Sequence, residues 1–397
     1  MSESPAPTND HRPVWEYVAP GEHRVPAAPV EQTLRTGFST FWRQLRPVAA
    51  PVDQPLIRED VEALSDKRLA AVAPEPGWVE AAAALDLALG SWLERSAEAP
   101  HAVVTLGHPH GGHDAVLRAW AAHRAWRLVR DPETHEVLGS HEDWFNELSG
   151  DGTPWVLPEL QRCFLRHVHG LSMVRALLAR IGRGEFGRGV IGCDSWSWAF
   201  LRHQWQGQGL PVLIAQAFDA ERLATWLAGL AATSGRPLVF RQSDNGRYLW
   251  PPADTASVPL SDFVRKLSIH SRGIPGVAWA TWRRSLVGTA RDPRRVGTQG
   301  GSTTVLVRPW GDLRDLIVPA DAPHDAGLVL HALLVHGGLP LTLLPLVTPL
   351  PEDEIAAVVS RLKAAELITS AGDRYQVSAL GYPTVRQLVA SRGFVTD

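Results

Sequence analysis

The sequence predicts an α/β protein with a parallel sheet, followed by a small C-terminal domain. Apolar runs of strand length alternate with helical patterns between residues 102 and 241, which is typical of a parallel sheet. The chain has 397 residues, a length that corresponds to two or three domains. Hydrophobic residues make up 45% of it and charged residues 20%, so the composition is that of a folded chain with a sizeable core.

Residues 1–100 are predicted to hold a tail and a helical segment. Residues 1–30 are polar and proline-rich and lack the basic and apolar regions of a signal peptide, so a disordered tail is expected there. Residues 31–100 are expected to form an N-terminal helical segment. Its clearest helix covers residues 77–96, where Trp78 and Leu85 fall on one side.

Residues 101–250 are predicted to form the α/β core. A glycine- and histidine-rich loop at residues 107–112 separates its first strand from its first helix. The expected strands are 102–106, 189–194, 210–216 and 237–241, and the expected helices are 115–128, 171–181, 197–206 and 221–232.

Residues 251–320 are predicted to form a helical lid and linker. Helical patterns run between residues 258 and 289 around a break at residues 271–276, and one strand is expected near residues 303–307. Further on, residues 326–350 carry no Asp, Glu, Lys or Arg and are long enough to span a bilayer. Because glycines, prolines and histidines interrupt them, two short buried helices are expected and no membrane span.

Residues 322–397 are predicted to form the C-terminal domain. Helices are expected at 324–336, 341–347, 352–365 and 382–391, with a β-hairpin at 367–378. Three helices and a hairpin resemble a winged helix, a module that often binds DNA through its third helix. Residues 322–397 contain five basic and seven acidic side chains, and the third predicted helix begins with three acids. A contact with protein, in a partner or within this chain, is therefore favoured over nucleic acid.

Net charge and cysteine content exclude further classes. The formal net charge is −3, so no overall positive field draws the chain to nucleic acid or to an anionic membrane. The two cysteines, Cys163 and Cys193, exclude a disulfide framework and favour a reducing cytoplasm. Both lie in apolar patterns and are interpreted as buried thiols rather than nucleophiles.

The loop after the first core strand has the spacing of a phosphate-binding loop, G-x-x-x-x-G-K-[ST]. In such loops, backbone amides surround the phosphates and the next helix points its N-terminus at them. His113 stands where the lysine is expected, and Asp114 replaces Ser or Thr. The candidate residues are Gly107, His108, Pro109, His110, Gly111, Gly112, His113 and Asp114.

On these residues the chain resembles a degenerate P-loop ATPase of the AAA+/STAND type with a C-terminal winged helix, over roughly residues 77–397. The resemblance implies ATP and Mg²⁺ as cofactors, with Asp194 as the magnesium-side acid. It places Gln216 near the sensor position and residues 271–276 at the turn of the lid. It also implies that Ser195 stands where the family has a catalytic glutamate.

Loss of the lysine and of the catalytic carboxylate removes two groups that stabilise the transition state. The expectation is an ATPase-like regulatory or scaffolding protein with a protein partner, weak or absent nucleotide binding and no efficient hydrolysis. Two alternatives stay open. One is an active ATPase of the same type that uses Asp194 and Asp114 for Mg²⁺. The other is a winged-helix regulator that binds DNA.

Three histidines in this loop also have a spacing that metal sites use. His108, His110 and His113 form H-x-H-x-x-H, and imidazole is a common metal ligand. No cysteine pair or Glu-x-x-His motif accompanies them. We therefore expect a histidine-substituted loop and no metal site.

Overall fold

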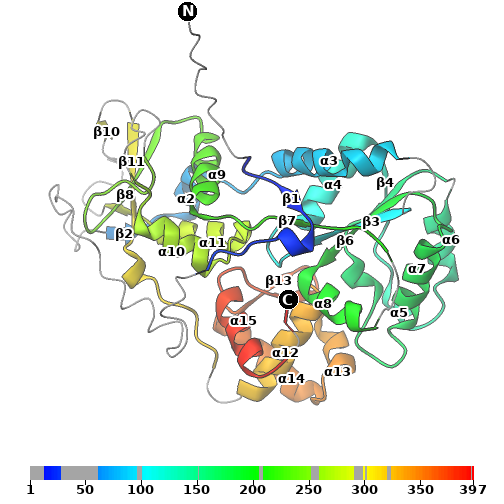
Figure 1. The fold of residues 1–397 in the computed structure, drawn as a ribbon. Coiled ribbons are helices and arrows are strands. Elements are labelled where there is room, and N and C mark those ends of the chain that lie inside the picture. Colours follow the sequence, from blue (N-terminus) through cyan, green and yellow to red (C-terminus); the bar gives the residue numbers. More distant parts are fainter. Residues whose placement is uncertain are drawn as a thin grey trace, which may run out of the picture.

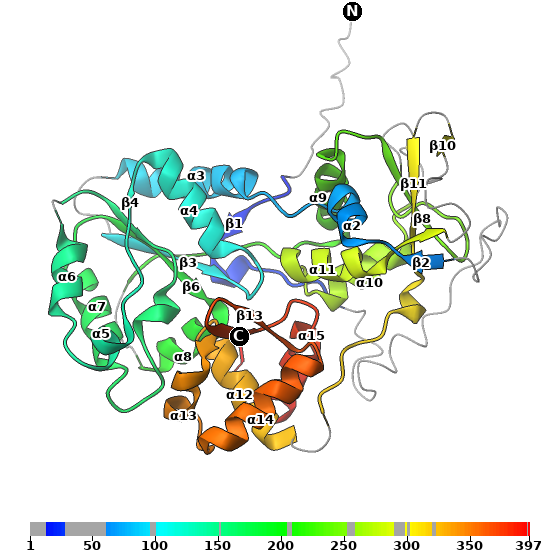
Figure 2. The same cartoon turned by 180° about the vertical axis from the view of Figure 1, so that it is seen from behind.

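The structure is a computed structural model that describes residues 13–27, 61–95, 101–150, 152–204, 209–251, 259–289, 298–299, 302–319, 323–394 and 396–397. Figures 1 and 2 show three parts. A large sheet has helices on both faces, and a second sheet lies beside it with helices of its own. The C-terminal domain, coloured orange to red, lies below both in Figure 1.

The main sheet confirms the predicted α/β class. Its strand order is β1-β7-β3-β6-β5-β4, and every neighbouring pair is parallel except β1 with β7. The strands are β1 (Tyr17–Val18), β3 (Ala102–Gly107), β4 (Arg127–Leu128), β5 (Trp155–Leu157), β6 (Gly189–Asp194) and β7 (Val212–Ala215). Both central strands, β3 and β6, are buried along their length, which explains why they read as continuous apolar runs.

Helices cover both faces of this sheet. Successive residues of β3 alternate between them, so Val103 joins one buried cluster while Val104 and Leu106 join the other. On the first face lie α3 (Val79–Glu94) and α4 (His113–Arg124). On the second lie α5 (Thr134–Leu138), α6 (Glu142–Ser149), α7 (Ser172–Gly182) and α8 (Ser195–Gln204).

The register of β3 and β6 places the candidate site. Gly107, the last residue of β3, pairs with Asp194, the last residue of β6. The glycine loop and Asp194 therefore leave the sheet at the same edge, where the carboxyl ends of parallel strands form the usual ligand crevice.

A second sheet accompanies the helices in the region predicted as lid and linker, where only one strand, near residues 303–307, was expected. Its strands are β2 (Val61–Ala63), β8 (Leu238–Gln242), β9 (Leu286–Thr289), β10 (Thr298–Gln299) and β11 (Ser302–Val307). Near it lie α2 (Asp66–Val72), α9 (Ala220–Ala232), α10 (Asp262–His270) and α11 (Pro275–Ser285). The run at 237–241, expected in the main sheet, instead pairs in parallel with β11 as β8. An apolar run indicates a buried strand, but distant residues decide which sheet it joins.

The C-terminal domain contains the predicted elements with small shifts at their ends. They are α12 (Pro323–Val335), β12 (Leu339–Pro340), α13 (Leu344–Val347), α14 (Glu352–Ala364), β13 (Ile368–Ala371), β14 (Arg374–Val377) and α15 (Tyr382–Ser391). Its three strands pair in the order β12-β14-β13. Gly337 and Gly338 have φ of 58° and 100° and form the expected turn after α12. Within the described ranges no helix is long and apolar enough to cross a membrane.

The predicted disordered tail is wrong for residues 13–27. There β1 adds an antiparallel edge strand to β7. Trp15 is only 6% exposed, and its ring centroid lies 4.8 Å from that of Phe218 in an edge-to-face contact. Burying an aromatic side chain of this size outweighs the tendency of the nearby prolines to leave the chain disordered. Residues 1–12 and 28–60 lie outside the described residues, so the rest of the tail and part of the helical segment are untested.

Candidate functional site

The strand, glycine loop and helix predicted around residue 107 are present as β3, the loop and α4. The loop closes on itself, because the Gly111 N–H donates to the His108 carbonyl at 2.8 Å. Gly112 caps α4 with a φ of 75°, in the left-handed region that favours glycine. A Cβ at Gly107 would lie only 2.4 Å from the His113 Cβ, so the close approach of these two residues requires glycine.

Two other segments cover this loop. The indole of Trp78 lies against Gly112, where an added Cβ would come within 2.3 Å of the ring. At the start of α11, the Gly276 N–H donates to the His110 carbonyl at 3.0 Å, and a Cβ at Gly276 would lie 2.3 Å from that oxygen. The top of the loop is therefore packed against protein on two sides.

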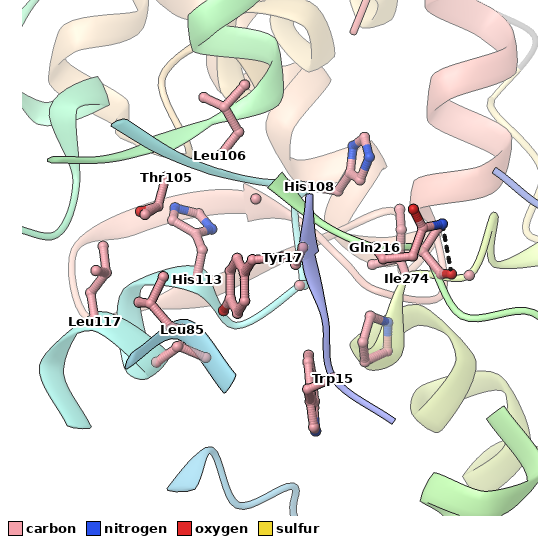
Figure 3. Close-up of a pocket in the computed structure, with 17 residues that line it drawn as sticks. Trp15, Tyr17, Leu85, Thr105, Leu106, His108, His113, Leu117, Gln216 and Ile274 are labelled. Carbon is pink, nitrogen blue, oxygen red and sulfur yellow. Dashed lines mark hydrogen bonds between the residues drawn. The ribbon is translucent and has the colours of Figure 1, made fainter. Parts of the chain in front are cut away.

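A small cavity lies on the side of the loop that faces β1 and β7 (Figure 3). Its volume is about 30 Å³, enough for roughly one water molecule. Trp15 and Tyr17 line it from β1 and the residues before it, and Gly107, His108 and Gly111 line it from the loop.

Gln216, predicted near a sensor position, also lines the small cavity. Its amide donates to the carbonyls of Arg24, at 2.5 Å, and Ala217, at 3.3 Å. The Arg24 N–H in turn donates to the Gln216 side-chain oxygen at 3.2 Å. The Gln216 side chain is therefore tied to the N-terminal segment.

A larger cavity of about 520 Å³ lies between the loop, α11 and the C-terminal domain. Five of the candidate loop residues and Asp194 line it, so the structure brings most of the predicted site together. These are Pro109, His110, Gly112, His113, Asp114 and Asp194. On the opposite wall lie Leu333, Gly337 and Gln376 of the C-terminal domain.

The two histidines at this cavity are neutral at physiological pH. Burial lowers the pKa of His110 to about 4 and lowers the pKa of His113. The Nε2 atoms of both are shielded from solvent and have no hydrogen-bond partner among the described residues. Neither ring therefore supplies the positive charge that a loop lysine would offer to phosphate.

Asp194 is almost completely buried, with 3% of its surface exposed. Its carboxylate accepts from the Trp196 N–H at 2.9 Å, and its own N–H donates to Gln161 Oε1 at 3.2 Å. Burial raises the pKa of Asp194 well above its ordinary value, so the neutral acid is favoured. In the described part of the chain, no three His, Cys, Asp or Glu side chains are arranged to hold a metal ion.

Replacing Asp194 by asparagine is expected to change how stability depends on pH. The free energy of unfolding of the variant, relative to that of the parent, should increase as the pH rises. In the parent, the folded state keeps a proton that the unfolded state loses above a pKa of 3.8, because burial raises the folded pKa. The free energy of unfolding of the parent therefore falls with rising pH, by at most about 1.4 kcal/mol per pH unit. Denaturant unfolding between about pH 4 and pH 8 measures the difference. The exposed Asp143→Asn serves as control, and parallel curves for Asp194→Asn and the parent would contradict the buried neutral acid.

Glu159 and Arg162 also line the larger cavity and were missed by sequence reasoning. Both follow β5: Glu159 directly precedes the 3₁₀ helix η4 (Leu160–Cys163), and Arg162 lies within it. Arg162 pairs with Glu159 at 3.1 Å, while its Nη1 is shielded and has no hydrogen-bond partner in the described ranges. The sequence does carry a sign of Glu159, because an apolar run is followed by an acid there, as it is at Asp194. That run is hard to recognise as a strand, since β5 has only three residues and prolines flank it.

His108 turns away from the larger cavity toward the C-terminal domain. Its Nδ1 lies 2.9 Å from Asp397 Oδ2 and 3.1 Å from Ser195 Oγ. Serine, histidine and aspartate are thus together, but both oxygens meet the same ring nitrogen. A hydrolytic triad uses the two nitrogens separately, so this arrangement is not a nucleophilic site.

No family model matches the sequence, and no curated protein matches it either. Solved structures do match over most of its length. A Walker-type ATPase of Pyrococcus abyssi is 16% identical, with 75% of this chain and 93% of that chain covered and a TM-score of 0.31. Two mutants of RuvB from Thermotoga maritima are each 14% identical, cover 78% and 79% of this chain and 93% of their own, and give TM-scores of 0.32 and 0.33. Similarities this low carry no conclusion about the activity of this chain.

Proposed function

We propose that this chain is an ATPase-like regulatory or scaffolding protein in which the former phosphate loop serves as a structural junction. Nucleotide binding is weak or absent, and hydrolysis is not efficient. The observation that carries this proposal is the packing of His113. At the position of the loop lysine stands a neutral imidazole tucked against Gly107, and no cation takes its place in the loop.

Contacts of the loop with its neighbours support the same proposal. Gly276 and Trp78 lie directly against the top of the loop, and the space beside β1 holds about 30 Å³. A nucleotide base and ribose are far larger than that space. Asp114 adds a negative charge to the wall of the larger cavity beside the loop, where it would repel phosphate.

Glu159 favours the active-ATPase alternative, because it places a carboxylate at the carboxyl end of β5 and in the larger cavity. That carboxylate is already engaged, since it accepts from Gln161 Nε2 at 3.3 Å and pairs with Arg162 at 3.1 Å. Glu159 therefore does not replace the missing catalytic group.

The C-terminal domain supplies the scaffolding part of the proposal. We assign its helices and three-stranded sheet to a winged helix that contacts protein rather than DNA, in a cytoplasmic chain. Ser197 Oγ donates to the Val335 carbonyl, and Trp196 Nε1 donates to the Tyr382 hydroxyl at 3.1 Å. These buried contacts join the domain to α8 of the core, so the domain serves as part of one assembled body.

Purified protein is expected to show no ATP or GTP turnover above background, because a loop cation and a free catalytic carboxylate are both lacking. Phosphate release with and without Mg²⁺ measures this. Asp194→Ala and the exposed Asp143→Ala are assayed beside the parent. Turnover that is lost in Asp194→Ala but kept in Asp143→Ala would establish an active ATPase and overturn the proposal.

A further inference from the structure

We propose that His108, Ser195 and Arg386 form a phosphate-binding site at the junction of the core and the C-terminal domain, and that Asp397 occupies it as an internal anion. The ligand would be a phosphate group, free or carried by a nucleotide, which displaces the Asp397 carboxylate. This site consists of side chains at the domain junction rather than the loop amides, so it does not depend on the proposed loss of nucleotide binding.

Four side chains converge on the Asp397 carboxylate, which is 1% exposed. Its Oδ2 accepts from Ser195 Oγ at 3.0 Å and from the Tyr382 hydroxyl at 3.3 Å, and lies 2.9 Å from His108 Nδ1. Its Oδ1 accepts from Arg386 Nε at 3.1 Å. Hydroxyl, imidazole and guanidinium donors around one buried anion are the groups that proteins use to bind phosphate.

More than one positive charge acts on the single negative charge of Asp397. Arg386 contacts it, and Arg272 lies close enough for its charge to act on both. Burial lowers the pKa of Arg272, and repulsion from Arg386 lowers it further, while Asp397 opposes this effect. Arg386 contacts the carboxylate, and the positive charge of Arg272 also acts on it. A phosphate, which carries up to two negative charges and more acceptor oxygens, would match them better than the single carboxylate does.

The Asp397 carboxylate is held as an anion despite its burial. Burial raises the pKa of Asp397, but the hydrogen bond with His108 and the charges of Arg386 and Arg272 bring it below its usual value. A further polar group is unsatisfied nearby. The ring of His23 lies 5.5 Å from that of His108, and its shielded Nε2 has no hydrogen-bond partner among the described residues. The site therefore selects negative charge and has a spare ring nitrogen beside it.

The four contacts come from distant parts of the fold. His108 belongs to the loop after β3, Ser195 begins α8, and Tyr382 and Arg386 lie on α15. Asp397 thereby fastens the C-terminal domain to the core. Exchange of this internal anion for phosphate would release the segment after α15, so occupancy of the site would control how that segment is held.

The test uses the full chain with Asp397→Asn and Asp397→Ala, titrated with inorganic phosphate and followed by thermal unfolding at constant ionic strength. Asn keeps one acceptor oxygen, which can serve either Ser195 or Arg386 because these two donate to different oxygens of Asp397, so this variant retains the fold more easily than Ala. Both variants are expected to bind phosphate at least about tenfold more tightly than the parent, because the competing carboxylate is gone. The exposed Asp373→Ala, which removes one negative charge from the same domain, should behave as the parent.

A second arm combines Asp397→Asn with Arg386→Gln, which should abolish the gain in phosphate affinity. A third arm replaces phosphate by ADP. Tighter binding of ADP than of phosphate assigns the site to a nucleotide phosphate, and equal or weaker binding assigns it to free phosphate. The proposal is overturned if folded Asp397→Asn binds phosphate no better than Asp373→Ala, or if Arg386→Gln leaves the gain intact. ATP turnover by the parent would contradict the proposed function but would not change the interpretation of these phosphate titrations.

Discussion

Replacing Gly192 by alanine is expected to destabilise the fold by about 3 kcal/mol. Gly192 lies in β6, which pairs with β3 on one side and with β5 on the other. A Cβ there would lie 2.1 Å from the Pro158 carbonyl oxygen and 2.4 Å from Leu117 Cδ1. The leucine can change rotamer, but the carbonyl belongs to the backbone directly after β5. The added methyl group can be accommodated only if the chain after β5 moves away from β6.

Denaturant unfolding of Gly192→Ala and of the parent measures this effect, with Gly229→Ala as matched control. Gly229 lies in α9, and a Cβ added there would meet nothing within 4 Å, so alanine should stabilise the protein by about 0.5–1 kcal/mol. Equal stability of Gly192→Ala and the parent would show that the chain after β5 does not lie against β6 as described. Because Pro158 precedes Glu159, the same substitution should also displace that wall of the larger cavity.

Elements with long periodic patterns could be predicted from the sequence. Strands β3 and β6 are buried on both faces and read as apolar runs, while α14 shows one apolar face with acids at its first turn. The turn at Gly337 and Gly338 was visible because two glycines interrupt a charge-free stretch. In each case neighbouring residues carry the information.

Elements that depend on distant partners could not be predicted. Strands β1 and β4 have two residues each and β5 has three, too few to show a period of two. Each becomes a strand only because the edge of a neighbouring strand is free to pair with it. The assignment of β8 to the second sheet depends in the same way on β11, more than sixty positions further along the chain.

The candidate site shows the same division. Glycine spacing identified the loop, and six of the nine residues predicted for the site line one cavity. The sequence could not show that His113 is turned inward against Gly107, because that depends on packing across the loop. Nor could it place Asp397 on His108, since 289 positions separate them. A motif of neighbouring residues can therefore be recognised in the sequence, whereas the side chains that pack into a site from distant positions depend on the fold.

Changing His113 to lysine together with Asp114 to threonine is expected to strengthen Mg-nucleotide binding by at least about tenfold, equivalent to about 1.4 kcal/mol. Both residues line the larger cavity, so the two substitutions add a cation beside it and remove a negative charge. Repulsion from Asp114 and the missing charge-assisted hydrogen bond would each weaken phosphate binding by about 1–3 kcal/mol. The helix N-terminus and loop backbone are unchanged by the substitutions and keep their attraction for anions.

Calorimetric titration of the double variant and the parent with Mg-ATP, and with ATP alone, measures the gain. His113→Lys and Asp114→Thr as single variants separate the added cation from the removed repulsion, and a larger gain from the pair than from either change is expected. Rapid hydrolysis should not return, because Ser195 donates to Asp397 and Glu159 is paired with Arg162. A folded double variant that binds no better than the parent would show that contacts of Trp78 and Gly276 with the loop have removed its shape for phosphate. In that case the loop is a structural junction alone, and its glycines serve only the close packing that they allow.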